Sequence, residues 1–284
     1  MNPYVQNADA RPRVAGGKLV VDAFNDQTLQ IVPDVRTFGW SFQGIPGDPY
    51  FIQEPGFNAS SSSGLAPGST LAFNVTRSLS FWNGSGSVGF GAIPSGESLV
   101  MNFGASTITI GGETGAQPGF AFATVGPNGS FHRHLNTFLR VGTSPQPATG
   151  VYLTSIRLTN SGGPAPSDPL FLLFRNGVTP PHFESALQYV ANPPAGDADF
   201  SGFIDLGDFA ILAANFNRSG ELFWYDGDFN RDYGVDVTDF SLLATNFNRP
   251  GTGGFARHVT VQVPEPSFLP FVALFGVVMW RRPC

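Results

Sequence analysis

One segment of the chain is written twice in succession, and this duplication constrains the fold more than any other feature. The first copy begins at Asp197 and continues to Arg218, and the second begins at Asp228 and continues to Arg249. Every matching residue keeps the same offset between the copies, through both an acidic stretch and the apolar stretch that follows it. Repetition at a fixed period indicates a duplicated structural unit rather than a chance cluster of acids.

Side chains with oxygen atoms fall at the first, third, fifth, ninth and twelfth positions of each acidic stretch, which is the spacing of a calcium-binding loop. The seventh position contributes a backbone carbonyl in such loops. The first loop offers Asp197, Asp199, Ser201, Phe203 (carbonyl), Asp205 and Asp208. The second offers Asp228, Asn230, Asp232, Gly234 (carbonyl), Asp236 and Asp239. The sequence therefore predicts two Ca²⁺ ions.

A helix is predicted after each loop, because apolar residues recur there at helical spacing. The predicted apolar faces are Phe209, Leu212, Ala213 and Phe216 in the first copy, and Phe240, Leu243, Ala244 and Phe247 in the second. We expect these two faces to pack on each other and form a small core. A solvated acidic linker is the alternative interpretation, but linkers do not repeat apolar helix faces.

At these residues the chain resembles a type I dockerin, a module of paired calcium loops and helices that docks onto cohesin domains. The resemblance covers 195–250 and implies a small α module with a cohesin-like partner. Two positions depart from the family pattern. Position six, usually glycine, is Gly202 in the first loop but Tyr233 in the second, at a cost of about 1–2 kcal/mol unless Gly234 takes the left-handed turn. Positions ten and eleven, usually polar in dockerins, are Leu206-Gly207 and Val237-Thr238.

The region before the duplication, residues 1–190, is predicted to be mainly β, as an antiparallel sandwich or jelly roll. Charged residues are only 13% of the chain, and short apolar or alternating runs are separated by turn residues. The runs are Lys18–Phe24, Thr37–Phe42, Ser69–Val75, Ser98–Phe103, Gly119–Thr124, Val151–Leu158 and Leu170–Phe174. The pairs Asn83-Gly84, Asn128-Gly129 and Asn176-Gly177 favour hairpin turns.

The acidity of the chain is local. Residues 196–250 hold ten acidic residues against three arginines, whereas the net charge of the whole chain is −6. The rest of the chain is therefore close to neutral and has no basic face. For this reason we expect no nucleic-acid partner. The single cysteine, Cys284, excludes a disulfide framework within the chain.

His132 and His134 are the only two histidines that lie close together in the sequence. Side chains two residues apart on a strand share a face, so both rings could bind one metal ion of a second type. A third ligand would come from elsewhere, with His182 or Glu184 as candidates. The alternative is a surface or structural pair without a metal.

Three features follow one another near the end of the sequence: Pro264-Glu265-Pro266, an apolar run at 268–280, and Arg281-Arg282. This order resembles a PEP-CTERM sorting signal, which implies processing by an exosortase-type enzyme after a linker at 251–263. Residues 264–284 would then form a short hydrophobic helix and a transient membrane anchor, although the run is shorter than the roughly 20 residues that span a bilayer. A buried terminal strand is the alternative. Arginines after the run place the rest of the chain outside the cytoplasm.

These patterns together predict an exported protein of the cell surface, outer envelope or extracellular matrix. No secretory signal is visible after Met1, so for an exported protein the true start is expected to lie upstream or to have been removed. The region before the duplication loosely resembles the β domain of planctomycete-type surface proteins and is expected to bind a partner or an extracellular polysaccharide. The alternative is a secreted polysaccharide-acting enzyme or a carbohydrate-binding protein that carries a dockerin. No catalytic set stands out in the sequence.

Overall fold

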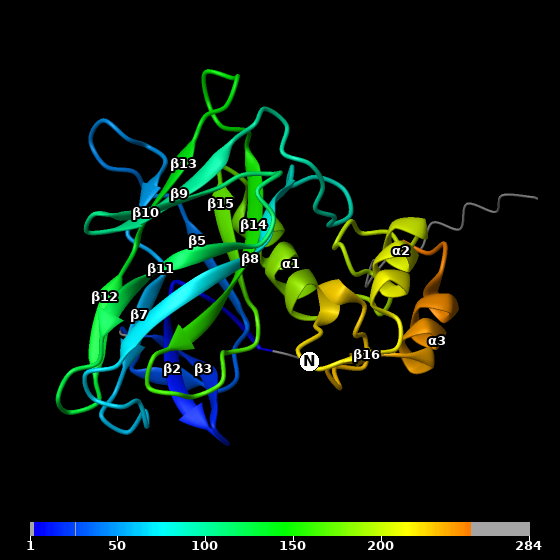
Figure 1. The fold of residues 1–284 in the computed structure, drawn as a ribbon. Coiled ribbons are helices and arrows are strands. Elements are labelled where there is room, and N and C mark those ends of the chain that lie inside the picture. Colours follow the sequence, from blue (N-terminus) through cyan, green and yellow to red (C-terminus); the bar gives the residue numbers. More distant parts are fainter. Residues whose placement is uncertain (1–2, 26, 251–284) are drawn as a thin grey trace, which may run out of the picture. The chain divides into compact units, whose positions relative to one another are not determined.

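The computed structural model describes residues 3–25 and 27–250, and this part of the chain is mainly β (Figure 1). The described residues all belong to one compact unit. The predicted linker at 251–263, the predicted C-terminal helix and the sorting residues Pro264, Glu265, Pro266, Arg281 and Arg282 lie outside the described residues. Of the helices in the described part, none is long and apolar enough to cross a membrane.

Three sheets make up the β region (Figure 1). The first has the order β1-β5-β15-β14-β8-β11, with bounds Tyr4–Gln6, Thr37–Ser41, Leu170–Asn176, Gly150–Asn160, Thr70–Trp82 and Gln117–Thr124. The second has the order β10-β9-β13-β6, with bounds Ser106–Ile110, Ser98–Phe103, Asn136–Arg140 and Phe51–Ile52. The third has the order β12-β7-β2-β3-β4, with bounds Phe131–His134, Gly56–Ala59, Asp9–Ala15, Lys18–Asn25 and Gln30–Val32.

The predicted mainly β architecture is present, but the antiparallel arrangement holds throughout only one of the three sheets, β10-β9-β13-β6, and the other two are mixed. Strand β5 lies parallel to both β1 and β15, and β2 lies parallel to β7 at the pair Ala10–Phe57. A parallel pair needs a long connection, because the chain must return to the same end of the sheet. Short runs and turn residues in the sequence do not reveal such connections.

Some strands were expected to be joined as hairpins at the Asn-Gly pairs, but no ladder joins the named strands on either side of these pairs in the described residues. Gly84, Gly129 and Gly177 do have the expected positive φ angles, between 76° and 80°. However, the strands before them pair with strands that are distant in the sequence: β8 pairs with β11 and β14, and Asn176-Gly177 leads into a helix. After Asn83-Gly84 the chain returns only to an isolated bridge between Phe81 and Gly91. Around Asn128-Gly129 the Gly126 N–H donates to the Ser130 carbonyl, but the strands before and after this turn belong to different sheets. The hairpin β2–β3 instead turns at Gly16 and Gly17.

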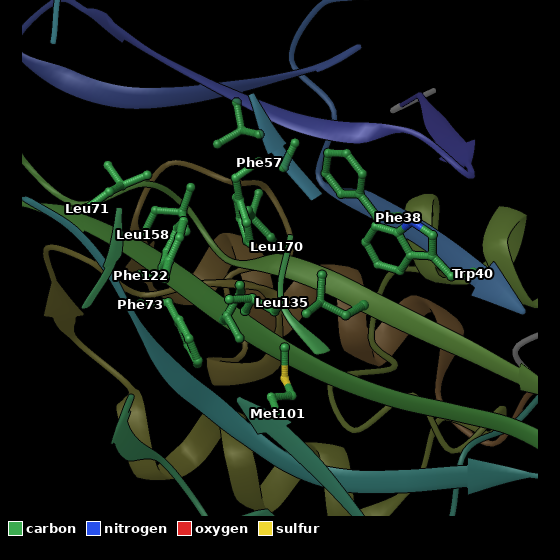
Figure 2. Close-up of a cluster of buried hydrophobic side chains, with 14 of the residues drawn as sticks. Phe38, Trp40, Phe57, Leu71, Phe73, Met101, Phe122, Leu135, Leu158 and Leu170 are labelled. Atoms are coloured by element: carbon green, nitrogen blue, oxygen red, sulfur yellow. The ribbon is translucent and has the colours of Figure 1, made fainter. Parts of the chain in front are cut away.

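One hydrophobic core receives side chains from all three sheets. Phe57 of β7, Phe73 of β8 and Phe122 of β11 gather at its centre (Figure 2), with ring centroids 4.4 Å apart for Phe57–Phe122 and 6.2 Å apart for Phe73–Phe122. Met101 of β9 contributes from the remaining sheet. Because aromatic rings bury large apolar areas, this cluster is the main stabilising feature of the β region.

Helix α1, Pro180–Ala191, follows the last strand and packs on a second cluster of buried side chains. Its residues Phe183 and Leu187 approach β5 so closely that a Cβ on Gly39 would lie 2.7 Å from either side chain. Glycine at position 39 therefore permits the helix to lie directly on the strand. Phe200, from the duplicated segment, belongs to the same cluster.

The duplicated segment forms helices α2, Leu206–Asn215, and α3, Val237–Asn246, which contact each other (Figure 1). A 3₁₀ turn, η1, Trp224–Asp226, lies between the copies. Two short strands, β16, Arg218–Ser219, and β17, Gly234–Val235, pair antiparallel. Both helices predicted after the loops are present, and each begins directly after the ninth position of its loop.

Candidate functional site

The two loops have the same local structure. Asp205 caps α2 with φ −138° and ψ −162°, and Asp236 caps α3 with φ −138° and ψ −163°. In each copy the residue at position twelve, Asp208 or Asp239, accepts a hydrogen bond from the backbone N–H of the cap and completes a reciprocal capping pair. An aspartate at both positions thus starts the helix and directs the position-twelve carboxylate back into the loop.

The copies exchange contacts with each other. Gly196 approaches α3, where its Cβ would lie 3.2 Å from Leu243 Cα, and Gly227 approaches α2, where its Cβ would lie 2.9 Å from Leu212 Cα. Their shared core consists of Ala198, Ile204, Leu212, Leu222, Phe229, Val235 and Leu243. Equivalent residues of the two copies thus make equivalent contacts. The two copies fold into similar halves that pack on each other.

The predicted packing of the two helix faces is wrong for the four phenylalanines and for Ala213 and Ala244, which are all exposed. Leu212 and Leu243 are buried, but Phe209, Phe216, Phe240 and Phe247 are each about 40% exposed (40–42%). The rings of Phe209 and Phe240 contact each other edge to face at a centroid distance of 6.3 Å. The core is filled instead by the residues at loop positions two and eight, which are Ala198 and Ile204 in the first loop and Phe229 and Val235 in the second. The phenylalanine rings therefore stay near the surface.

The first loop brings three carboxylates together, Asp197, Asp199 and Asp208, with one oxygen from each within 4.8 Å of the others. Asp197 and Asp208 are fully buried. Burial raises the pKa of Asp197 to about 8, and the nearby charges of Asp208 and Asp199 add to the rise. Burial also raises the pKa of Asp208 to about 6. Three converging acids of this kind require protons or a cation.

One atom of this cluster tests whether calcium fits. Asp197 Oδ1 is buried and has no hydrogen-bond partner, whereas Oδ2 accepts from the Gly202 backbone N–H at 3.2 Å and from the Tyr189 hydroxyl. A buried carboxylate oxygen without a partner is costly. Its neighbours Asp199 and Asp208 offer only acceptors when ionised, so a hard divalent cation fits the donor set.

The remaining predicted ligands of the first loop lie at its rim. The Ser201 hydroxyl donates to the Phe203 carbonyl at 3.1 Å, and the Asp205 carboxylate accepts from the Gly207 N–H at 2.7 Å. Neither Ser201 nor Asp205 belongs to the close group of three carboxylates. These residues hold the shape of the loop in the described structure, and their lone pairs remain available for an ion.

The second loop repeats the buried carboxylates of positions one and twelve as Asp228 and Asp239, but both Asp228 oxygens accept backbone N–H groups of the loop. Asp239 Oδ1 accepts from the Phe229 N–H at 2.8 Å, as Asp208 Oδ1 accepts from the Ala198 N–H at 2.7 Å. Burial raises the pKa of Asp228. Among the other predicted ligands, Asn230 Nδ2 donates to Asp232 Oδ2 at 2.8 Å, Asp236 is the cap of α3, and Gly234 lies in β17.

Position six needs a left-handed backbone in both loops. Gly202 has φ +84°, and Tyr233 has φ +67°, so the tyrosine itself takes the turn and Gly234 does not. Lys18 of β3 holds the tyrosine, with its Nζ 4.6 Å from the ring centroid and 3.2 Å from the hydroxyl oxygen. These contacts with the β region offset part of the cost of the backbone conformation.

The first loop is docked on the β region through residues that the sequence did not single out. Arg77 of β8 is half-buried, and its Nη2 donates to the Asp199 carbonyl at 2.9 Å, while its guanidinium lies 4.8 Å from the Phe200 ring centroid. The Phe90 N–H donates to the Phe200 carbonyl at 2.7 Å. No local pattern marks Arg77 or Phe90, because their role depends on a contact distant in the sequence.

The histidine pair lies elsewhere, on β12. His132 Nε2 and His134 Nε2 are 2.9 Å apart, and Asp9 of β2 joins them. The proposed third ligands are wrong: Glu184 accepts hydrogen bonds from Tyr4 and Gln6, and His182 contacts the Trp82 ring. Which strands lie side by side decides the third member of the group, and the sequence does not show that order.

Comparisons with known proteins add little. No family model matches the chain, and no curated protein matches it. A crystal structure of a type II cohesin–X-dockerin complex from Acetivibrio cellulolyticus shows 16% identity over 55% of this chain and 83% of that chain, with a TM-score of 0.16. Similarity at this level supports neither a fold nor a function.

Proposed function

We propose that residues 195–250 form a dockerin-like module that binds two Ca²⁺ ions, one in each loop. The observation that carries the proposal is the buried carboxylate group of the first loop, in which Asp197 Oδ1 has no hydrogen-bond partner. The matching cap geometry of the second loop supports a second ion. Calcium would supply the positive charge that the converging acids lack.

The chemistry of such a module is binding and folding rather than catalysis. Asp197, Asp199 and Asp208 would hold the first ion, with Ser201, Asp205 and the Phe203 carbonyl completing its oxygen shell. Asp228, Asn230, Asp232, Asp236, Asp239 and the Gly234 carbonyl would hold the second. Ionised carboxylates repel one another, so an ion at each site stabilises the closed loop and the helix that begins from it.

The module is proposed to dock a cohesin-like protein domain through α2 and α3. Equivalent apolar side chains of the two helices support this: Leu206 and Val237 are 72% and 65% exposed. Large exposed apolar side chains often mark a surface that binds another protein. Because α2 and α3 carry equivalent side chains, a partner could bind the module in either of two orientations. The β region, a β-sandwich in this proposal, would be a binding or structural module for an extracellular polysaccharide or protein.

The proposed location is the cell surface, outer envelope or extracellular matrix, after export. This rests on the PEP-CTERM-like order of Pro264-Glu265-Pro266, the apolar run and Arg281-Arg282. An exosortase-type enzyme would cleave near the Pro-Glu-Pro motif after transient anchoring in the membrane. Mass spectrometry of the protein isolated from the source cells tests this step, since a mature form that still carries Cys284 would contradict it.

Thermal unfolding of the full chain tests the calcium proposal. We expect the melting temperature to rise when calcium is added to chelator-treated protein, and magnesium at the same concentration to have a much smaller effect. An Asp197→Asn variant removes one charge of the first loop and should lose part of the calcium-dependent rise. A melting temperature that does not respond to calcium in the wild-type protein would contradict the proposal.

A further inference from the structure

A separate group of side chains, far from the calcium loops in the sequence, has the chemistry of a transition-metal site. His132 and His134 alternate on β12, so both rings lie on one face of the sheet. His132 Nε2 lies 2.9 Å from His134 Nε2 and 3.0 Å from Asp9 Oδ2, and His134 Nε2 lies 3.9 Å from Asp9 Oδ1. Two imidazoles and one carboxylate thus converge on a single point.

These separations match the spacing of ligand atoms around a small metal ion. With bonds of about 2.0–2.1 Å in tetrahedral geometry, two ligand atoms lie about 3.3 Å apart. Two of the observed distances, 2.9 and 3.0 Å, are shorter than this value, and the third, 3.9 Å, is longer. Small rotations of the side chains would bring both Nε2 atoms and one Asp9 oxygen into bonding distance of one ion.

The backbone of β7 makes this convergence possible. Strand β7 lies between β2 and β12, so the Asp9 side chain must pass over it to reach the histidines. The residue that β7 presents there, opposite His134, is Gly56. A Cβ at Gly56 would lie 2.7 Å from His134 Cε1 and closer still to the Asp9 carboxylate. The site therefore needs glycine at this position.

A second layer of groups orients His134. Its Nδ1 lies 3.1 Å from the Gln53 carbonyl oxygen and 3.5 Å from Glu54 Oε2. Because a carbonyl oxygen only accepts, the neutral ring carries its hydrogen on Nδ1, which leaves the Nε2 lone pair directed toward His132 and Asp9. The hydrogen bond with Glu54 raises the pKa of His134 to about 9, so at neutral pH a metal ion must displace the proton on Nε2. Imidazoles that bind metals commonly donate their other N–H to a carbonyl or carboxylate in this way.

We propose that Asp9, His132 and His134 bind one divalent transition-metal ion of the zinc class. Imidazole nitrogen is a ligand of zinc and similar ions, whereas calcium takes oxygen ligands, so this site is independent of the calcium loops. The His132 side chain is 49% exposed and that of His134 is 30% exposed. The ion can therefore enter from solvent, and a fourth position remains open to water or to a ligand from another molecule.

Calorimetric titration of the calcium-saturated full chain with ZnCl₂ tests the site. We expect one zinc ion per chain, and binding at least tenfold weaker in both His132→Ala and Asp9→Asn. His182→Ala is the matched control, since His182 is an exposed histidine outside the group and its loss should leave zinc binding unchanged. Titration with cobalt(II) adds a spectroscopic reading, because its visible absorption bands report imidazole ligation and coordination geometry.

The rival arrangement is a hydrogen-bonded cluster in which a proton joins the two imidazoles. Absence of zinc binding in wild-type protein would support that rival and overturn the metal site. Zinc binding of equal strength in wild type, His132→Ala and Asp9→Asn would place the ion elsewhere and would also overturn it. Calcium binding by both variants, measured in the same way, shows that they are folded and separates this test from that of the calcium loops.

Discussion

The guanidinium of Arg77 donates a hydrogen bond to the backbone carbonyl of Asp199, at 2.9 Å, and thereby joins a strand of the β region to the first calcium-type loop. Asp199 is a predicted ligand, so the loop that would close around an ion is the same loop that rests on the β region. Phe200, the next residue, is fully buried among side chains of that region. Occupation of the first loop and docking of the module should therefore be coupled.

A Gly89→Ala substitution tests this coupling. A Cβ at residue 89 would lie 2.8 Å from the Ser201 carbonyl carbon and closer to its oxygen, so the first loop must move. Overpacking of this kind costs about 1–3 kcal/mol. We expect weaker calcium binding at the first loop and unchanged binding at the second. Gly91→Ala is the control, because its Cβ would meet no atom within 4 Å. Equal calcium affinities in both variants would contradict the coupling.

The position-twelve aspartates should each control one ion. Asp208→Ala and Asp239→Ala are each expected to reduce the calcium stoichiometry by one, because this residue closes the coordination shell. Both alanine variants should also lose stability without calcium, since each carboxylate accepts three backbone N–H groups in its loop. Asparagine at the same positions keeps an acceptor oxygen and should retain more of that stability. Full calcium stoichiometry in either alanine variant would contradict the ligand assignment.

Without calcium, the stability of the protein should fall as the pH rises from about 4 to about 8. The folded-state pKa values of Asp197 and Asp208, about 8 and about 6, exceed the ordinary value of 3.8, so the folded protein binds these protons more tightly than the unfolded chain. Their contribution is complete below the ordinary value and is lost as the pH passes the raised values. The Asp199 carboxylate faces both Asp197 and Asp208, whereas the Tyr189 hydroxyl and the Arg77 guanidinium act on Asp197.

Urea unfolding at pH 5 and pH 8, with and without calcium, measures this effect. We expect the stabilisation by calcium to be larger at pH 8, since protons compete with the ion at pH 5. In Asp197→Asn the dependence on pH should be smaller. Calcium-free stability that is equal or greater at pH 8 would contradict the assigned charges of the first loop.

Tyr233→Gly tests two opposing effects of Tyr233 on the second loop: the strain of its left-handed backbone and the contacts of its ring. Glycine adopts the left-handed turn without the cost of about 1–2 kcal/mol, so the second ion should bind up to about tenfold more tightly. The same change removes the contacts of the ring with Lys18 and Phe223, which should lower the melting temperature. Tyr233→Phe, which keeps the strain and the ring, is the control. Weaker calcium binding in the glycine variant would show that anchoring outweighs strain.

Local patterns in the sequence predicted local structure well. The duplication located α2 and α3, and the alternating runs located β3, β5, β9 and β15 closely. The spacing of the acids predicted that Asp197, Asp199 and Asp208 would meet, because ligands within one loop are brought together by the loop itself. Such features depend on neighbours in the sequence, which a single sequence shows directly.

Features that depend on the order of strands could not be predicted. Asp9 joins the histidine pair only because β7 lies between β2 and β12 and presents Gly56 there. The outward position of Phe209 and Phe240 depends on how the small core fills, since Ile204 and Val235 occupy the space that the rings were expected to take. Long-range pairing, rather than periodicity, decides these outcomes.

Calorimetric titration of the chelator-treated, full-length wild-type chain with CaCl₂ tests the central proposal most directly. Two loops with the same cap geometry and buried position-twelve carboxylates predict two calcium ions per chain. The first loop should bind more tightly, because Gly202 adopts the left-handed turn that is strained at Tyr233. Binding of one calcium ion, or of none, would contradict the assignment of the duplicated segment as a pair of calcium sites.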